Sequence, residues 1–252
     1  MEPSADQKDA LRDRGYTVLP GAVAPPLVEA ALRAVNASLG RGLRAEDVAR
    51  FRAQTFCPEL EQAPVLLDLV EESGLLGVTD HLFGAGRLER VRHAQVALAF
   101  PTAEAAVPPH PHLDGMYTPE NGVPRGEILS FTALLGVLLS DLPLPGMGNL
   151  TVWPGSHLAY ERYFREKGPR SLLEGMPQAE IGAPQPVRGR AGDAVLCHYQ
   201  LAHTGGANAS PHIRYAVYFR LKVKGHDRRR WECLTDVWRE WPGLRASAPT
   251  GP

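Results

Sequence analysis

The 252-residue sequence has few cysteines, almost no net charge and no long apolar run, and each shortage narrows the class of protein. Its three cysteines, Cys57, Cys197 and Cys233, are odd in number and lack the close spacing of structural zinc or redox motifs, so we expect reduced thiols. The 27 basic and 28 acidic residues give a formal net charge of -1, without a basic stripe that follows a phosphate backbone. We therefore expect no nucleic-acid partner.

The sequence also lacks the signals of a membrane or secreted protein. No stretch approaches the roughly 18 apolar residues of a membrane span, and residues 1–15 are charged and polar where a secretory signal needs an apolar core. We therefore expect a cytoplasmic protein with no membrane partner. A hydrophobic content of 44% is enough for one well-buried core, and we expect a single domain over residues 1–252. The oligomeric state is left open.

Hydrophobic spacing predicts mainly helices up to residue 84 and mainly β-strands from residue 90 onward. Tyr16–Leu19 predicts a strand, and apolar residues at helical spacing between Pro25 and Gly40 predict a helix, with another over 64–84. Further along, short apolar or alternating runs separated by Pro and Gly predict antiparallel strands. These runs are 90–100, 128–139, 149–153, 193–199 and 213–223. Because no helix recurs between them, the pattern favours a sandwich or jelly roll over a βαβ sheet.

Two segments without clear periodicity, 115–127 and 158–189, are rich in Pro, Gly and charge. We expect both to be lid loops over a site. Four apolar residues near the C-terminus recur at helical spacing and predict a helix near 230–241 that packs on the core. These residues are Trp231, Leu234, Trp238 and Trp241. The final residues, 246–252, are expected to be a disordered tail.

The run HPHLDG at residues 110–115 places two imidazoles and a carboxylate within five positions. A single His-x-Asp pair is weak evidence by itself. On a strand, however, alternate side chains project to the same face, so His112 and Asp114 converge on one ion. That site needs a third ligand, and His203, which follows an apolar strand and precedes Thr204-Gly205, is a candidate.

Arg214 begins the alternating run 213–221, in which apolar residues occupy the odd positions and Arg214 faces the other way. Burying an arginine is costly unless an anion pairs with it, and its planar fork fits a carboxylate through two hydrogen bonds. A bound dicarboxylate meets that requirement. Two imidazoles and one carboxylate on one face of an octahedral ion leave three open positions, which is the arrangement of non-haem Fe(II) oxygenases.

Taken together, these motifs resemble the phytanoyl-CoA dioxygenase family. The likeness rests on HPHLDG, on the turn VWPGSH at 152–157, on His203 followed eleven residues later by Arg214, and on the opening GYTVLPGAV. It spans roughly residues 10–223. The resemblance implies a mainly β fold with flanking helices (α+β), a double-stranded β-helix of the cupin-like jelly-roll type. It also implies an Fe(II)- and 2-oxoglutarate-dependent dioxygenase that uses O2 to oxidise a C–H bond of a small organic substrate, releasing succinate and CO2.

The same resemblance assigns roles to four residues. It makes His112, Asp114 and His203 the iron ligands and catalytic residues, and Arg214 the partner of the C5 carboxylate of 2-oxoglutarate. Related halogenases have a small residue at the position of Asp114. The carboxylate therefore favours hydroxylation, desaturation or cyclisation over halogenation.

Further contacts follow from the resemblance or from position in the chain. Gln95 is expected near the cosubstrate, and Thr132 is a second candidate for that role. His110, Tyr117 and Trp153 are candidate substrate contacts, although His110 fits an exposed loop equally well. Two other functions stay open, a metal-binding jelly roll without oxygenase activity and a zinc-dependent hydrolase that uses the same ligands. The identity of the substrate is not indicated.

Overall fold

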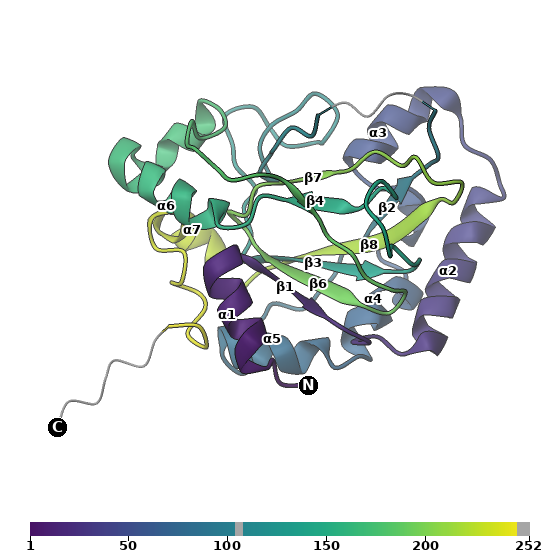
Figure 1. The fold of residues 1–252 in the computed structure, drawn as a ribbon, viewed down its shortest axis with the longest axis horizontal. Helices are drawn as coiled ribbons and strands as arrows, with labels where there is room; N and C mark the ends of the chain where they lie inside the picture. The colour runs from purple at the N-terminus through teal and green to yellow at the C-terminus, as the bar shows by residue number, and fades with distance from the viewer. Residues whose placement is uncertain (104–107, 246–252) are drawn as a thin grey trace.

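Two antiparallel β-sheets form the centre of the computed structural model, which describes residues 1–103 and 108–245 (Figure 1). The larger sheet has the strand order β1-β6-β3-β8-β2, and the smaller has the order β5-β4-β7. The strands are β1 Tyr16–Leu19, β2 Gln95–Ala99, β3 Ala133–Leu138, β4 Leu150–Val152, β5 Gln185–Pro186, β6 Ala194–His198, β7 His203–Gly205 and β8 Arg214–Leu221. Neighbouring strands far apart in sequence show that the sheets form by long-range pairing, as the predicted jelly roll requires.

Helices surround the two sheets. In Figure 1, α6 and α7 lie together at one end, whereas α2 lies at the opposite end of the sheets. The α-helices are α1 Ala5–Arg14, α2 Pro25–Leu39, α3 Val48–Ala53, α4 Pro64–Glu71, α5 Leu75–Phe83, α6 Ser156–Lys167 and α7 His226–Thr235. Single 3₁₀ turns are η1 Ala45–Asp47, η2 Pro58–Leu60 and η3 Pro169–Leu173. Within the described ranges, no helix has the length and apolarity needed to cross a membrane.

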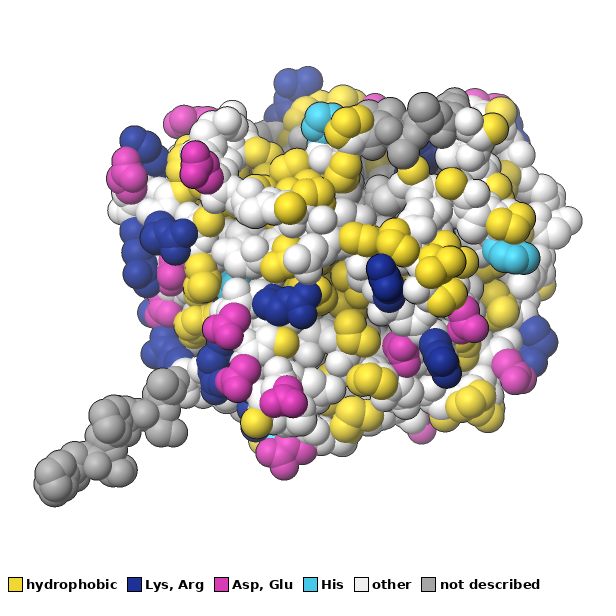
Figure 2. All heavy atoms as spheres, viewed as in Figure 1, with side chains coloured by type: hydrophobic (Ala, Val, Ile, Leu, Met, Phe, Trp, Pro, Cys, Tyr) yellow, Lys and Arg dark blue, Asp and Glu magenta, His cyan; other side chains and the backbone are white. Residues whose placement is uncertain are grey.

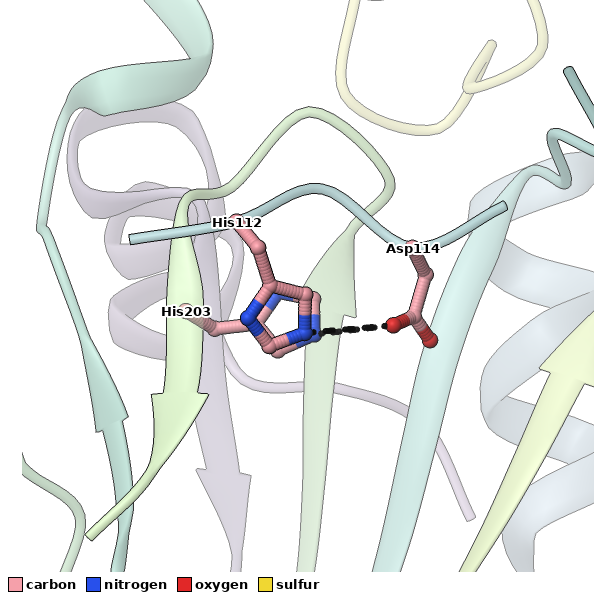
Figure 3. Close-up of side chains that lie close together, drawn as sticks. All are labelled: His112, Asp114 and His203. Carbon is pink, nitrogen blue, oxygen red and sulfur yellow. Dashed lines mark ion pairs between the residues drawn. The ribbon is translucent and has the colours of Figure 1, made fainter. Parts of the chain in front are cut away.

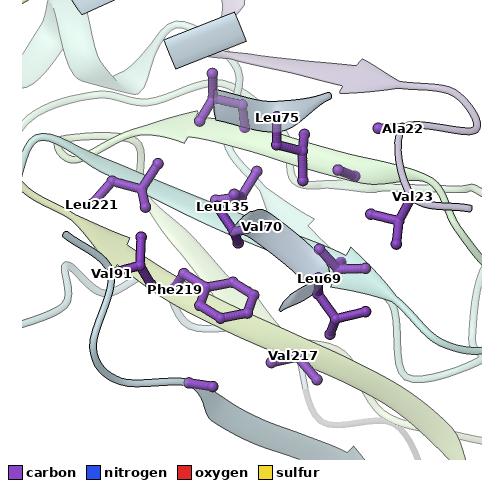
Figure 4. Packing of buried hydrophobic residues seen from close by; sticks show 14 of the residues in the cluster. Ala22, Val23, Leu69, Val70, Leu75, Val91, Leu135, Val217, Phe219 and Leu221 are labelled. Atoms are coloured by element: carbon purple, nitrogen blue, oxygen red, sulfur yellow. The ribbon is translucent and has the colours of Figure 1, made fainter. Parts of the chain in front are cut away.

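The main hydrophobic core lies between the larger sheet and helices α2, α4 and α5 (Figure 4). Strand alternation creates it, because the alternate residues Val217, Phe219 and Leu221 of β8 belong to the same buried cluster as Leu69 and Val70 of α4. All of these residues are buried. The other face of β8 is thereby left for the space between the sheets, where a second core cluster packs around Leu138 and Val152.

Most predicted elements are confirmed. The strand Tyr16–Leu19 has the predicted bounds, and the helix between Pro25 and Gly40 is α2. Each of the five predicted β runs contains one strand, so the jelly roll with flanking helices is also confirmed. On the face seen in Figure 2, basic and acidic side chains are interspersed.

Three predictions of local structure were wrong or incomplete. The single helix predicted over 64–84 is two helices, because the chain turns at Ser73–Gly74 between α4 and α5. The segment 158–189 is not all loop, since α6 occupies its first part and η3 follows. The C-terminal helix is α7, which ends before Trp238, and the last tryptophan packs instead in the turns that follow. The helix α1 precedes β1, where no element was predicted. The predicted tail at 246–252 lies outside the described residues.

Candidate metal and cosubstrate site

A cavity of about 1240 Å³ opens between the sheets and is lined by residues from several segments that are far apart in the sequence. The inward faces of β2 and β8 form one wall, and β7 with the segment 112–118 forms another. Its lining includes Gln95, His112, Asp114, His203, Arg214 and Tyr218. The fold therefore brings the predicted metal ligands and the predicted cosubstrate anchor to one cavity.

Three side chains within this cavity form the His-Asp-His cluster, which we define as His112, Asp114 and His203 (Figure 3). The Nε2 atoms of His112 and His203 lie 3.4 Å and 3.5 Å from the same oxygen of Asp114, Oδ1. The two imidazole rings lie side by side, with centroids 4.6 Å apart. The three donor atoms are all within 4.8 Å of one another, which is the spacing of ligands around one ion.

Backbone pairing, not a continuous strand, holds the cluster together. His112 and His203 form an isolated antiparallel bridge, with N–H to carbonyl distances of 3.0 Å and 3.2 Å in the two directions. Asp114 lies in the turn that follows, so strand alternation was the wrong reason for its convergence with His112. Gly115 is required in that turn. It has φ +78°, and a Cβ there would lie 2.2 Å from the carbonyl oxygen of Leu129.

The hydrogen bonds of His203 fix its tautomer. Its Nδ1 lies 2.9 Å from the carbonyl oxygen of Leu201, and a carbonyl accepts, so Nδ1 carries the proton. In the neutral ring, Nε2 then presents its lone pair toward Asp114 Oδ1. Two acceptors that face each other at this distance need a cation between them, either a proton or a metal ion.

The pKa values of the three cluster residues reflect a competition between burial and neighbouring charges. Burial pulls the pKa of His203 down, but the hydrogen bond and charge of Asp114 outweigh it and raise that pKa. Burial opposes ionisation of Asp114, yet the Arg220 guanidinium and the two imidazoles hold its pKa well below the usual range. The pKa of His112 is lowered, chiefly by burial, although 48% of its side chain remains exposed at the cavity mouth. Asp114 is thus the anion of the cluster at neutral pH.

Arg214 lies in the cavity wall at the start of β8, with 6% of its surface exposed. Its Nε donates to the carbonyl of Gly148 at 2.8 Å, and its Nη1 donates to that of Ala97 at 3.1 Å. Gly148 makes this approach possible, because a Cβ there would lie 2.6 Å from the Cβ of Ala99 and 3.2 Å from that of Arg214. The backbone therefore positions the guanidinium, while no carboxylate among the described residues pairs with it within ion-pair distance. Its remaining N–H groups are available to an anion.

Two further residues of β8 face the same cavity, and the sequence analysis missed both. Tyr218 and Arg220 share the parity of Arg214, so the alternation that selected Arg214 also selects them. Arg220 donates from Nε and Nη2 to Oδ2 of Asp114, at 3.1 Å and 2.7 Å. Gln95, on β2 opposite Tyr218, lines the cavity at a position compatible with its predicted role.

Thr132 lies elsewhere. Its hydroxyl donates to Oε2 of Glu240 at 2.6 Å and accepts from the backbone N–H of Val223, and it is absent from the described cavity lining. Glu240 Oε2 also lies 2.8 Å from Nδ1 of His226, whose Nε2 is 2.9 Å from the hydroxyl of Ser130. All four residues of this hydrogen-bonded group are buried, so the group has the composition of a catalytic triad without access to a substrate. We interpret it as a structural link between the C-terminal segment and the larger sheet.

The three candidate substrate residues lie in different surroundings, and one of them lines the cavity. Tyr117 lines the cavity, with the guanidinium of Arg125 4.5 Å from its ring centroid. Trp153 is 5% exposed and packs in the second core cluster, away from the described lining, because the turn after β4 directs it inward. His110 is exposed and is also outside that lining. Of the three, Tyr117 alone remains a candidate contact.

A family model described as phytanoyl-CoA dioxygenase (PhyH) matches residues 11–216. The chain belongs to this family. The match includes the His-Asp-His cluster and Arg214, so the predicted family is confirmed for the part of the chain that carries the site. A comparison with curated protein sequences found no match.

Solved structures similar to this PhyH-family chain share its fold at low sequence identity. The carbocyclase SnoK from nogalamycin biosynthesis, described as non-haem and α-ketoglutarate-dependent, is 23% identical, with a TM-score of 0.59 and 90% of each chain covered. EctD from S. alaskensis, solved with bound Fe, is 20% identical, with a TM-score of 0.58 over 87% of this chain and 76% of EctD. HygX from Streptomyces hygroscopicus, solved with nickel and 2-oxoglutarate, is 20% identical, with a TM-score of 0.57 over 88% of each chain.

Proposed function

We propose that this protein is an Fe(II)- and 2-oxoglutarate-dependent oxygenase that oxidises a C–H bond of a small organic molecule. The observation that carries the proposal is the combination of the His-Asp-His cluster and Arg214 in one cavity. Family membership and neighbours solved with Fe or with 2-oxoglutarate support the same cofactors. The His-Asp-His cluster alone does not explain the buried guanidinium of Arg214. One ligand that binds the metal at one end and Arg214 at the other explains both.

The donor set of the cluster fits Fe(II). Two imidazole nitrogens and one carboxylate oxygen converge from one side, as in the facial triad of non-haem Fe(II) oxygenases. The Nδ1–H bond of His203 to Leu201 aims its Nε2 lone pair into the cluster. His112, Asp114 and His203 would hold the ion. When bound, iron together with 2-oxoglutarate and O2 supplies the oxidising chemistry, with succinate and CO2 as products.

The protein then supplies binding, orientation and exclusion of water. Arg214 would hold the far carboxylate of 2-oxoglutarate through its unused N–H groups, in a buried position where a charged hydrogen bond is strong. Gln95 lines the same cavity and would contribute a polar contact to the cosubstrate. Apolar residues lining the cavity, including Met116, Leu134 and Leu150, reduce the access of water to the reacting atoms.

Succinate formation tests the proposal. Purified protein supplied with Fe(II), ascorbate and 2-oxoglutarate should form succinate slowly without a substrate, and His203→Ala should abolish this activity. Arg33→Met is the matched control, because Arg33 pairs with Glu29 on the exposed surface of α2. Absence of both succinate formation and 2-oxoglutarate binding in folded protein would refute the proposal.

Neither of the two alternative functions, a zinc hydrolase or a structural metal site, uses Arg214. A zinc hydrolase uses the same three ligands to activate water, and a structural metal site needs no cosubstrate. Both leave a buried guanidinium beside the cavity without an anion. Activity that requires zinc and is independent of 2-oxoglutarate would favour the hydrolase. Metal binding without succinate formation would favour the structural site.

A further inference from the structure

The two oxygens of Asp114 have different partners. Oδ1 faces the Nε2 atoms of His112 and His203 at 3.4 Å and 3.5 Å. Oδ2 accepts both N–H groups of Arg220, at 3.1 Å from Nε and 2.7 Å from Nη2. The carboxylate is therefore divided, with one oxygen directed to the candidate metal position and the other held by a guanidinium.

Arg220 is itself fixed by its surroundings. It projects from the cavity-facing side of β8, and its guanidinium carbon lies 5.8 Å from the ring centroid of Phe131. That ring packs edge-on against Tyr199, whose hydroxyl donates to the backbone carbonyl of Asp114 at 3.2 Å. The aromatic pair and the arginine thus hold Asp114 by its main chain and its side chain together. With 38% of its side chain exposed, Arg220 also borders the open cavity.

This contact determines how many positions around the ion Asp114 can occupy. A carboxylate that binds through one oxygen leaves three of six octahedral positions open beside two imidazoles, whereas one that binds through both leaves two. A chelating 2-oxo acid and O2 together need three. Because Arg220 engages Oδ2 with two N–H groups, rotation of Oδ2 toward the ion would break two charged hydrogen bonds.

We propose that Arg220 is a positioning residue that restricts Asp114 to a single metal-binding oxygen and so keeps the third open position available for the cosubstrate. The inference rests on the proposed function and adds a residue that the family match does not reach, since that match ends at residue 216. It concerns the arrangement of ligands and not the strength with which the metal is held.

The test uses Co(II) as the metal probe in full-length protein. Crystal structures of Co(II)-loaded wild type and Arg220→Met should show one Asp114 oxygen on the metal in the wild type and both in the variant. Titration of 2-oxoglutarate into the two Co(II) forms, followed by the change in cobalt absorption, should give a Kd at least about 10-fold higher for Arg220→Met. Arg220→Lys, which keeps the charge with a less suited donor geometry, should raise it about 3-fold. Arg33→Met should leave it unchanged.

Thermal denaturation of the metal-free proteins identifies any loss of folding. A folded Arg220→Met with the wild-type Kd and a single-oxygen contact would overturn the inference. Where the methionine variant fails to fold, a folded Arg220→Lys with a Kd equal to the wild type would overturn it. Failure of the wild type to bind Co(II) or 2-oxoglutarate would instead refute the proposed function, so the two outcomes are distinct.

Discussion

Replacing Arg214 by methionine isolates the contribution of its guanidinium to cosubstrate binding. The substitution keeps an apolar stem and removes a charged group that is 6% exposed and lines the cavity. It also removes two hydrogen bonds to the carbonyls of Gly148 and Ala97, so some loss of stability is expected. The assay must therefore separate cosubstrate recognition from folding.

The size of the effect follows from burial. Removing one partner of a buried ion pair costs about 3–5 kcal/mol, because the remaining charge is left without compensation. Each 1.4 kcal/mol corresponds to about a tenfold change in affinity. Water that enters from the cavity mouth would solvate the orphaned carboxylate in part, so we expect the lower end, a rise of about 100-fold in the KM for 2-oxoglutarate.

A second cosubstrate separates recognition from instability. 2-Oxopentanoate has the same chain length as 2-oxoglutarate but lacks the second carboxylate. Wild-type protein should favour 2-oxoglutarate by about 100-fold in kcat/KM for the decarboxylation, whereas Arg214→Met should favour neither by more than about 3-fold, because the discriminating partner is absent. General instability lowers both activities equally and leaves the ratio unchanged.

The result that would refute the reasoning is a retained preference. If folded Arg214→Met still favours 2-oxoglutarate about 100-fold, another group recognises the far carboxylate. Arg33→Met, which removes an exposed arginine paired at 3.5 Å, should preserve the wild-type ratio. Arg214→Lys should fall between wild type and methionine, because an ammonium keeps the charge without the planar fork.

Three further predictions concern the metal, the turn and the pH. Asp114→Ala should abolish succinate formation and Co(II) binding, and turnover at the wild-type rate would contradict the assignment. Gly115→Ala should destabilise the protein by more than about 1 kcal/mol in thermal denaturation, because the new Cβ meets a carbonyl oxygen, whereas Gly126→Ala, with the same φ of +78° and open space around it, should cost less. Burial lowers the pKa of His157 to about 4 and that of His198 to about 3, so below pH 6.5 the unfolded chain binds protons that the folded chain does not. The free energy of unfolding from urea titration should therefore fall by about 1.4 kcal/mol per pH unit for each histidine as the pH drops from 6.5 toward 4, and equal values at pH 7 and pH 5 would refute this.

Sequence patterns predicted the elements whose signals are local. Alternation identified β8 and the direction of Arg214, and turn residues identified β1 and α2. The helix α1 also has a local signal in the sequence, a capping box in which Ser4 and Gln7 exchange hydrogen bonds. The apolar stripe of α1 is weak, because Leu11 is the only residue of this helix that is buried. Hydrophobic periodicity therefore does not indicate the helix.

The site was less predictable where it depends on contacts between distant segments. The family motifs supplied the three cluster residues, but the geometry that unites them is a bridge between His112 and His203, not a strand through 112–114. Arg220 lies 106 positions from Asp114, so alternation gives its face without giving its partner. Thr132 lies just before β3, yet its hydroxyl is directed to Glu240, a partner that no local pattern indicates.

The register of β8 connects the hydrophobic core to the chemistry of the cavity. A slip of one residue would move Arg214, Tyr218 and Arg220 to the opposite face of the strand. Two features oppose it. The alternate residues Val217, Phe219 and Leu221 are buried against the helices, and the ring of Tyr218 fits beside β3 because position 136 is glycine, where a Cβ would lie 2.6 Å from it. Core packing and Gly136 thus select the one register in which both guanidiniums face the cavity. The packing of β8 against the helices therefore determines which of its side chains line the cavity.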